Sequence, residues 1–236
     1  MTIDPSEIIY FQWGFVKITA TIVFTWITMA ILGIGSYLIT RNIKVDGEIS
    51  KGQNILEALV ETIRSQIKQI SQQEPGKYLP FIGTLFIFIL AANVLSIIPG
   101  FIAPTGSLDT SVALALCVFL AVPVYGIADG GVKEYLKEYI KPTFIMLPFN
   151  IISEISRTLS LAIRLYGNVM SSSIIVAILL GVIPLFFPVI IQALGLLTGV
   201  IQAYIFAILA IVYIASATKR KDNEKDNAQF TNHKSQ

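Results

Sequence analysis

Long apolar runs alternate with short polar stretches along this chain, and the pattern predicts helices that cross a membrane. We expect a first span at 14–39, a second at 78–98 and a third at 111–128. A helix needs about 20 residues to cross a hydrocarbon core of roughly 30 Å, and each run is near that length. These three segments are therefore interpreted as membrane-spanning helices.

Residues 52–73 have a different period. Their apolar side chains recur at helical spacing and are Leu56, Leu59, Ile63, Ile67 and Ile70. Charged residues such as Glu57 and Arg64 fall on other faces, as in an amphipathic helix. We expect this helix to lie flat at the cytoplasmic interface of the membrane; the alternative is that it packs against a soluble partner.

The last two apolar segments are too long for upright spans. The helical pattern of 147–184 covers 38 residues, or about 57 Å at 1.5 Å per residue. A return segment follows at 189–217, after a turn marked by Gly181, Pro184 and Pro188. We therefore expect two long, steeply tilted helices in a hairpin, followed by a cytoplasmic tail at 218–236. The predicted fold is an all-α integral membrane protein with about five membrane-embedded helices and one interfacial amphipathic helix.

Composition and charge support this class and suggest an orientation. Charged residues make up 14% of the chain, against about 25% in soluble domains. A net charge of +2 does not indicate nucleic-acid binding. Lys and Arg concentrate in 40–54, 129–142 and the tail, whereas the N-terminus and the 100–110 loop lack them. The positive-inside rule then places the N-terminus outside and the C-terminus in the cytoplasm.

The first residues, MTIDPSEI, lack the basic segment of a signal peptide, so we expect the first span to remain as an anchor. We expect the bacterial plasma membrane as the location, with the thylakoid membrane as the alternative.

Arg164 is the strongest candidate for a functional residue. It lies in a stretch, 159–218, that is otherwise free of formal charge. An arginine in hydrocarbon costs at least about 2.5 kcal/mol on insertion scales, which makes it a functional hypothesis by default. At about 100° per residue, a line of polar residues shares its helix face within roughly 40°. The line consists of Asn150, Ser153, Arg157, Ser160, Arg164, Asn168 and Ser171.

The chemistry of this line indicates an ion gate rather than a catalyst. An arginine stays protonated, so it cannot relay a proton, but it can attract a carboxylate and stop a cation. Gln202 on the return segment is a candidate hydrogen-bond partner for the arginine region. Two structural alternatives are open: Arg164 pairs with Glu154, or Arg157 extends to the membrane interface. No catalytic residues, metal site or cofactor are expected, and a self-contained channel or secondary transporter is the competing functional class.

Two stretches resemble subunit a of F-type ATP synthases. They are SRTLSLAIRLYGNVM at 156–170 and IQAYIFAILAIVYI at 201–214, and the likeness extends over most of the chain. The resemblance implies a stator subunit with two half-channels, in which Arg164 faces the carboxylates of a rotating c-ring. It implies that Asn168 and Gln202 line the ion path or contact the arginine region. The implied partners are the c-ring, the b subunits of the peripheral stalk and the bilayer.

Two positions depart from that pattern. Many proton-driven members carry a carboxylate nine residues after the arginine, where this chain has Ser173. They often carry a histidine or an acid seven residues before the glutamine, where this chain has Gly195. The sequence of the segment PTFIMLPFNIISEISRTLSLAIRLYGN looks most like the N-type branch of these enzymes, for which sodium coupling is implied. A water-filled proton path is the alternative.

Overall fold

The structure is a computed structural model, and it describes residues 9–13, 16–41, 51–72, 74–98, 100–133, 146–182 and 187–233. Its helices are α1 (Ala20–Thr40), α2 (Lys51–Ser71), α3 (Leu79–Leu95), α4 (Leu108–Gly130), α6 (Met146–Val182) and α7 (Phe187–His233), with two short strands, β1 (Ile9–Trp13) and β2 (Val16–Thr19), and two single-turn 3-10 helices, η2 (Pro75–Lys77) and η3 (Pro104–Gly106).

Four of the described helices are long and apolar enough to cross a membrane. They contain the segments Ala20–Leu38, Leu108–Ala128, Leu147–Gly181 and Phe187–Thr218, and α3 adds a shorter apolar helix of 17 residues. Helices can cross a bilayer because each satisfies its own backbone hydrogen bonds. The prediction of an all-α membrane protein is confirmed.

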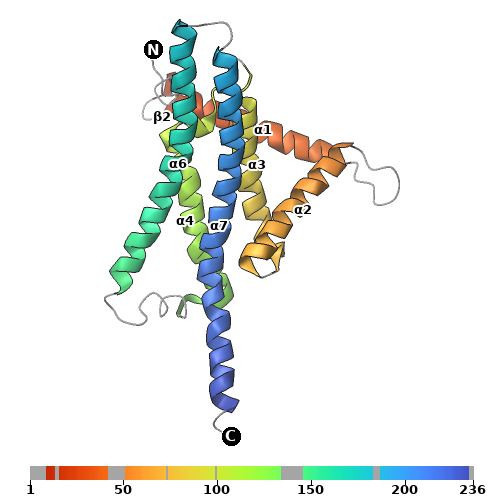
Figure 1. Cartoon of the computed structure of the whole chain (residues 1–236), viewed down its shortest axis with the longest axis vertical. Coiled ribbons are helices and arrows are strands. Elements are labelled where there is room, and N and C mark those ends of the chain that lie inside the picture. The colour runs from red at the N-terminus through yellow and green to blue at the C-terminus, as the bar shows by residue number, and fades with distance from the viewer. Residues whose placement is uncertain are drawn as a thin grey trace.

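The long hairpin runs in a different direction from α1. In Figure 1, α1 lies across α6 and α7, which run roughly along the longest axis of the molecule. The 21 residues of α1 extend about 31 Å, which matches one membrane core, whereas the 37 residues of α6 extend about 55 Å. Helix α6 is therefore longer than one upright span requires.

The N-terminal end of α1 corrects the expected start of the first span. Residues 16–19 form β2, which pairs antiparallel with β1 so that Trp13 lies opposite Val16 and Ile9 opposite Thr19. The helix begins only at Ala20. The segment is rich in β-branched and aromatic residues, which favour strands, and hydropathy does not distinguish an apolar strand from an apolar helix.

Other helix ends also differ from the expected bounds. Helix α4 begins at Leu108 because the Ser107 hydroxyl accepts a hydrogen bond from the Thr110 N–H at 3.3 Å, a typical N-cap. Helix α7 continues to His233, through most of the segment expected as a tail. Residues 200–233 contain neither glycine nor proline, so no helix-breaking residue ends it earlier.

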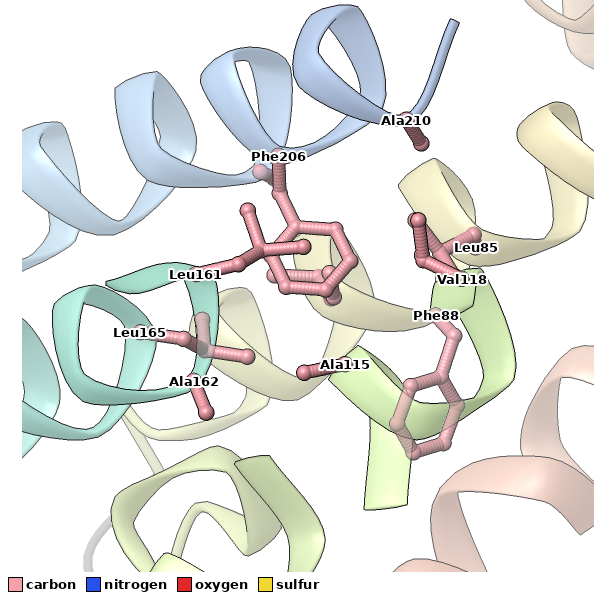
Figure 2. Close-up of a cluster of buried hydrophobic side chains, with 11 residues drawn as sticks. Leu85, Phe88, Ala115, Val118, Leu161, Ala162, Leu165, Phe206 and Ala210 are labelled. Atoms are coloured by element: carbon pink, nitrogen blue, oxygen red, sulfur yellow. The ribbon is translucent and has the colours of Figure 1, made fainter. Parts of the chain in front are cut away.

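A hydrophobic cluster joins α3, α4, α6 and α7. Figure 2 shows Phe206 of α7 pointing toward Leu161 and Leu165 of α6, with Ala115 of α4 beside them. Several of the buried members are alanines, which let membrane helices approach closely. This packing uses one face of α6 and leaves its other faces outside the core.

The amphipathic helix α2 packs on the chain's own helices. Ile63 and Ile67 are buried in a second cluster with residues of α3, α4 and α7, among them Ile82 and Ile211. At the other end of α2, Ile55 is exposed. Leu59 and Ile70 pack against the same cluster, so four of the five predicted apolar residues have a partner inside the chain, which the periodicity of one helix could not identify.

Candidate functional site

The polar line predicted on α6 lies beside the packed face of the helix. Leu161, Ala162 and Leu165 are buried in the core, and Arg164 is exposed. At about 100° per residue, the arginine points roughly 60–100° away from Leu161 and Leu165. Beyond the line, Ile163 and Leu159 form part of an exposed apolar surface. Arg164 therefore lies on a surface that the chain does not cover with its own helices.

The whole line shares this environment. Its exposed members are Ser153, Arg157, Ser160, Arg164 and Ser171, and its half-buried members are Asn150 and Asn168. Only 6% of an 18-residue apolar window of α6 is buried inside the chain, against 39% for that of α7. A long helix this little buried, with an arginine at its middle, has a surface available for another membrane component.

Arg164 makes no hydrogen bond or ion pair with any residue that the structure describes. The alternative in which it pairs with Glu154 is thus not seen. A buried ionised group needs a counter-charge or water, and in a membrane neither is supplied by lipid tails. The guanidinium is consequently free to meet an acidic group brought by another chain.

Packing between α6 and α7 places Gln202 near the level of Arg164. A Cβ added to Gly195 would lie 3.1 Å from Ser172, so these two positions face each other. Counting from them in opposite directions along the antiparallel helices brings residue 202 opposite residue 165. Gln202 is only 5% exposed, and its Nε2 is buried without a hydrogen-bond partner among the described residues. The predicted bond between Gln202 and the arginine does not form in this structure.

A polar cavity of about 280 Å³ lies toward the turn of the hairpin from Arg164. Its polar lining consists of Asn93, Ser96, Ser172, Ser173 and Gln192, and Gly195 also lines it. The two positions at which the sequence departs from the proton-driven pattern, Ser173 and Gly195, therefore share one cavity. Among the lining residues that the structure describes, none is an acid, a base or a histidine.

Asn93, one of the residues that line this cavity, belongs to a buried polar network. The Asn93 side chain donates to the Gly199 carbonyl at 3.0 Å and accepts from the Thr105 hydroxyl at 3.3 Å. The Ser111 hydroxyl donates to the Thr105 carbonyl at 3.0 Å. The network thus ties α3, η3, α4 and α7 together. The sequence interpretation missed it, although an asparagine inside an apolar helix is itself a signal of a buried partner.

The second part of the loop between α3 and α4, residues 103–107, is buried. Thr105 and Ser107 are fully buried, and a Cβ at Gly106 would lie 3.1 Å from a methyl group of Val169 in α6. The short, turn-rich sequence lets the loop fit between the helices, and its hydroxyls find partners there.

Arg157 extends toward α7 and not away from the protein. Its guanidinium carbon lies 5.6 Å from the centre of the Tyr213 ring, within the range of a cation–π contact. Among the described residues, no group of acids, histidines or cysteines could hold a metal ion.

Comparison with known proteins matches this arrangement to one family. The family described as ATP synthase A chain matches residues 22–215. ATP synthase subunit a 1 of Crocosphaera subtropica is 56% identical over 227 residues, covering 96% of this chain and 99% of the relative. ATP synthase subunit a 2 of Acaryochloris marina is 58% identical, covering 93% and 94%. ATP synthase subunit a of Albidiferax ferrireducens is 56% identical, covering 93% and 95%. The chain therefore belongs to the family of ATP synthase subunit a, the A chain of these complexes.

Proposed function

We propose that this chain is the ion-translocating stator subunit of a rotary ATP synthase, with Arg164 as the electrostatic separator between two half-channels. The observation that carries the proposal is an exposed arginine in the middle of an apolar hairpin, with no partner among the described residues of its own chain. In the proposed complex, carboxylates of the c-ring pass the polar line of α6. Each must release its bound ion before it can pair with the guanidinium.

The two half-channels would lie on opposite sides of Arg164. With the N-terminus outside and the C-terminus in the cytoplasm, the cavity lined by Asn93 and Ser173 opens the outer half-channel. The cytoplasmic half-channel would follow the polar line through Ser160, Ser153 and Asn150 toward the start of α6. The b subunits would contact faces of the stator away from the ring. The membrane would be a bacterial plasma membrane, or a thylakoid membrane as the alternative.

Sodium is the ion that the cavity favours. Its described lining offers hydroxyl and amide oxygens, which can coordinate a cation but do not exchange protons near neutral pH, and includes no titratable side chain. The proton remains the competing ion, because water in a cavity of this size can carry it without a titratable relay.

Ion transport by the chain alone, compared with the assembled complex, tests the proposal. We expect purified chain in sealed vesicles to pass no sodium or protons, and vesicles with the assembled complex to take up sodium when ATP is added. Flux through the chain alone would support the self-contained channel. Uptake that is ATP-driven but equal with and without sodium would retain the stator and assign the proton.

Gln202→Leu is expected to lower coupled ion uptake by at least tenfold without lowering the amount of assembled complex. Its amide bonds to no described residue, so an apolar side chain of similar size leaves no partner unsatisfied. In the ion path the Gln202 amide would bond a charged group, and such a hydrogen bond is worth about 1.5–3 kcal/mol. Since each 1.36 kcal/mol corresponds to a tenfold change in rate, its loss predicts a decrease of at least tenfold.

Thr198→Val is the matched control for that change. Thr198 lies one turn away on α7, and its hydroxyl donates only within its own helix, to the carbonyls of Leu194 and Gly195. Uptake should be unchanged in this variant. Equal losses in the two variants, or none in Gln202→Leu, would remove Gln202 from the ion path.

A further inference from the structure

The charge on the polar line of α6 is confined to one half of it. Arg157 precedes Arg164 by seven residues, which places it within about 20° on the same face and about 10.5 Å along the helix. Toward the hairpin turn, the line continues with Asn168 and Ser171, and no charged residue occurs before the end of α6. The half of the line near the start of α6 therefore carries two cations and the other half none.

Tyr213 fixes the position of the second cation. Its ring is half-buried and packs against both hydrophobic clusters of the chain, so it is held by α3, α4 and α7. The Arg157 guanidinium lies over this ring at 5.6 Å. Figure 1 shows α6 and α7 diverging toward this end of the hairpin, so the contact bridges the two helices where they separate. The guanidinium is thereby kept beside the line and does not extend into the lipid interface.

The acid nearest to Arg157 along α6 is Glu154, a neighbour on the helix surface that forms no ion pair with it. Glu154 lies three residues earlier, about 60° around the helix, and is half-buried. No ion pair forms between Arg157 and any residue that the structure describes. The Arg157 charge is thus not neutralised by a bonded carboxylate among the residues that the structure describes.

We propose that Arg157, positioned by Tyr213, lowers the affinity of the cytoplasmic half-channel for the coupling cation and leaves that of the outer half-channel unchanged. The inference rests on the proposed rotary function. A cation near a ring carboxylate favours its ionised, ion-free form, and it repels a second cation on the same path. The effect would be one-sided, because none of the described residues that line the outer cavity is charged. It would favour release of the ion into the cytoplasm.

Side-specific titration of the coupling cation tests this inference in the assembled complex. In inverted vesicles the cytoplasmic side faces the medium, so the external concentration at half-maximal ATP-driven uptake reports the cytoplasmic half-channel. In right-side-out vesicles the outer side faces the medium. The external concentration at half-maximal gradient-driven ATP synthesis then reports the outer half-channel. Sodium is titrated where uptake depends on sodium, and pH where it does not.

Arg157→Gln is expected to lower the half-saturating concentration on the cytoplasmic side by roughly two- to tenfold, as one charge at about 10 Å gives for a dielectric between water and protein. Tyr213→Leu should also lower this concentration, but by less. Tyr213→Phe keeps the ring and Arg157→Lys keeps the charge. Both of these variants should therefore stay near the parent value. The outer value should not change in any of them.

The inference is overturned if the half-saturating concentration on the cytoplasmic side is unchanged in whichever of Arg157→Gln and Tyr213→Leu assembles. It is also overturned if the concentrations on the two sides shift equally. The two substitutions lie on different helices, and the two conservative variants cover the case in which either fails to assemble: a shifted cytoplasmic value in Tyr213→Phe or Arg157→Lys would also contradict it. Failure of the rotary function itself would appear differently, as normal coupled uptake in Arg164→Ala.

Discussion

Arg164→Ala is expected to abolish ATP-driven ion uptake and ATP synthesis by the assembled complex. The substitution removes the only charge in the middle of the hairpin, so a ring carboxylate passing this level has no counter-charge. Removing one partner of a desolvated charge pair costs about 2–5 kcal/mol, which corresponds to a rate loss of at least 30-fold. We also expect a passive leak, because a cation can then move between the half-channels without turning the ring.

The measurement is coupled uptake in vesicles, together with passive ion conductance after the soluble head is removed. Ile155→Ala is a suitable control, since Ile155 is an exposed residue of the same helix on the face opposite Arg164. It should retain both coupling and a tight membrane. The separator role would be refuted by an Arg164→Ala complex that assembles, pumps at the parent rate and does not leak.

Gly199→Ala is expected to destabilise the subunit by about 1–3 kcal/mol, the usual cost of overpacking a filled core. The added Cβ would lie 2.9 Å from the Asn93 Cγ, a distance that requires one of them to move. Asn93 cannot easily move, because its amide bonds both the Gly199 carbonyl and Thr105. Thermal unfolding of the purified complex, and the amount of the subunit in membranes, measure the loss.

Gly83→Ala provides the matched comparison. Gly83 is also a buried helical glycine, but an added Cβ meets nothing within 4 Å. We therefore expect Gly83→Ala to leave the stability of the subunit unchanged or to raise it by up to about 1 kcal/mol. Combining Gly199→Ala with Asn93→Ala should cost less than the sum of the two single changes, because the smaller side chain relieves the contact. Additive costs would show that the close approach does not limit stability.

The sequence predicted those features that depend on local pattern. Spans follow from hydropathy, because the bilayer requires every backbone group to be satisfied within its own helix. The polar line on α6 follows from the 3.6-residue period, and the structure leaves this line uncovered by the chain's core. The sequence also identified Ser173 and Gly195 as unusual without showing that one cavity holds both.

Features that depend on distant partners were not predictable in this way. The partner of Asn93 lies 106 residues along the chain, and the buried position of Thr105 depends on three other helices. Arg157 had two open interpretations, since only the position of Tyr213 on α7 decides which way its side chain extends. Residues 16–19 were interpreted as the start of a helix, whereas they pair with β1 as strand β2. Hydropathy alone does not distinguish an apolar strand from an apolar helix.

The bond between Asn93 and Gly199 has a consequence for biogenesis. Ribosomes deliver α3 and α4 to the membrane before α7 exists, so the Asn93 amide then has no acceptor on α7. An unsatisfied amide in hydrocarbon costs several kcal/mol. A nascent or truncated chain that lacks α7 therefore exposes a polar defect, which insertion of the last helix removes.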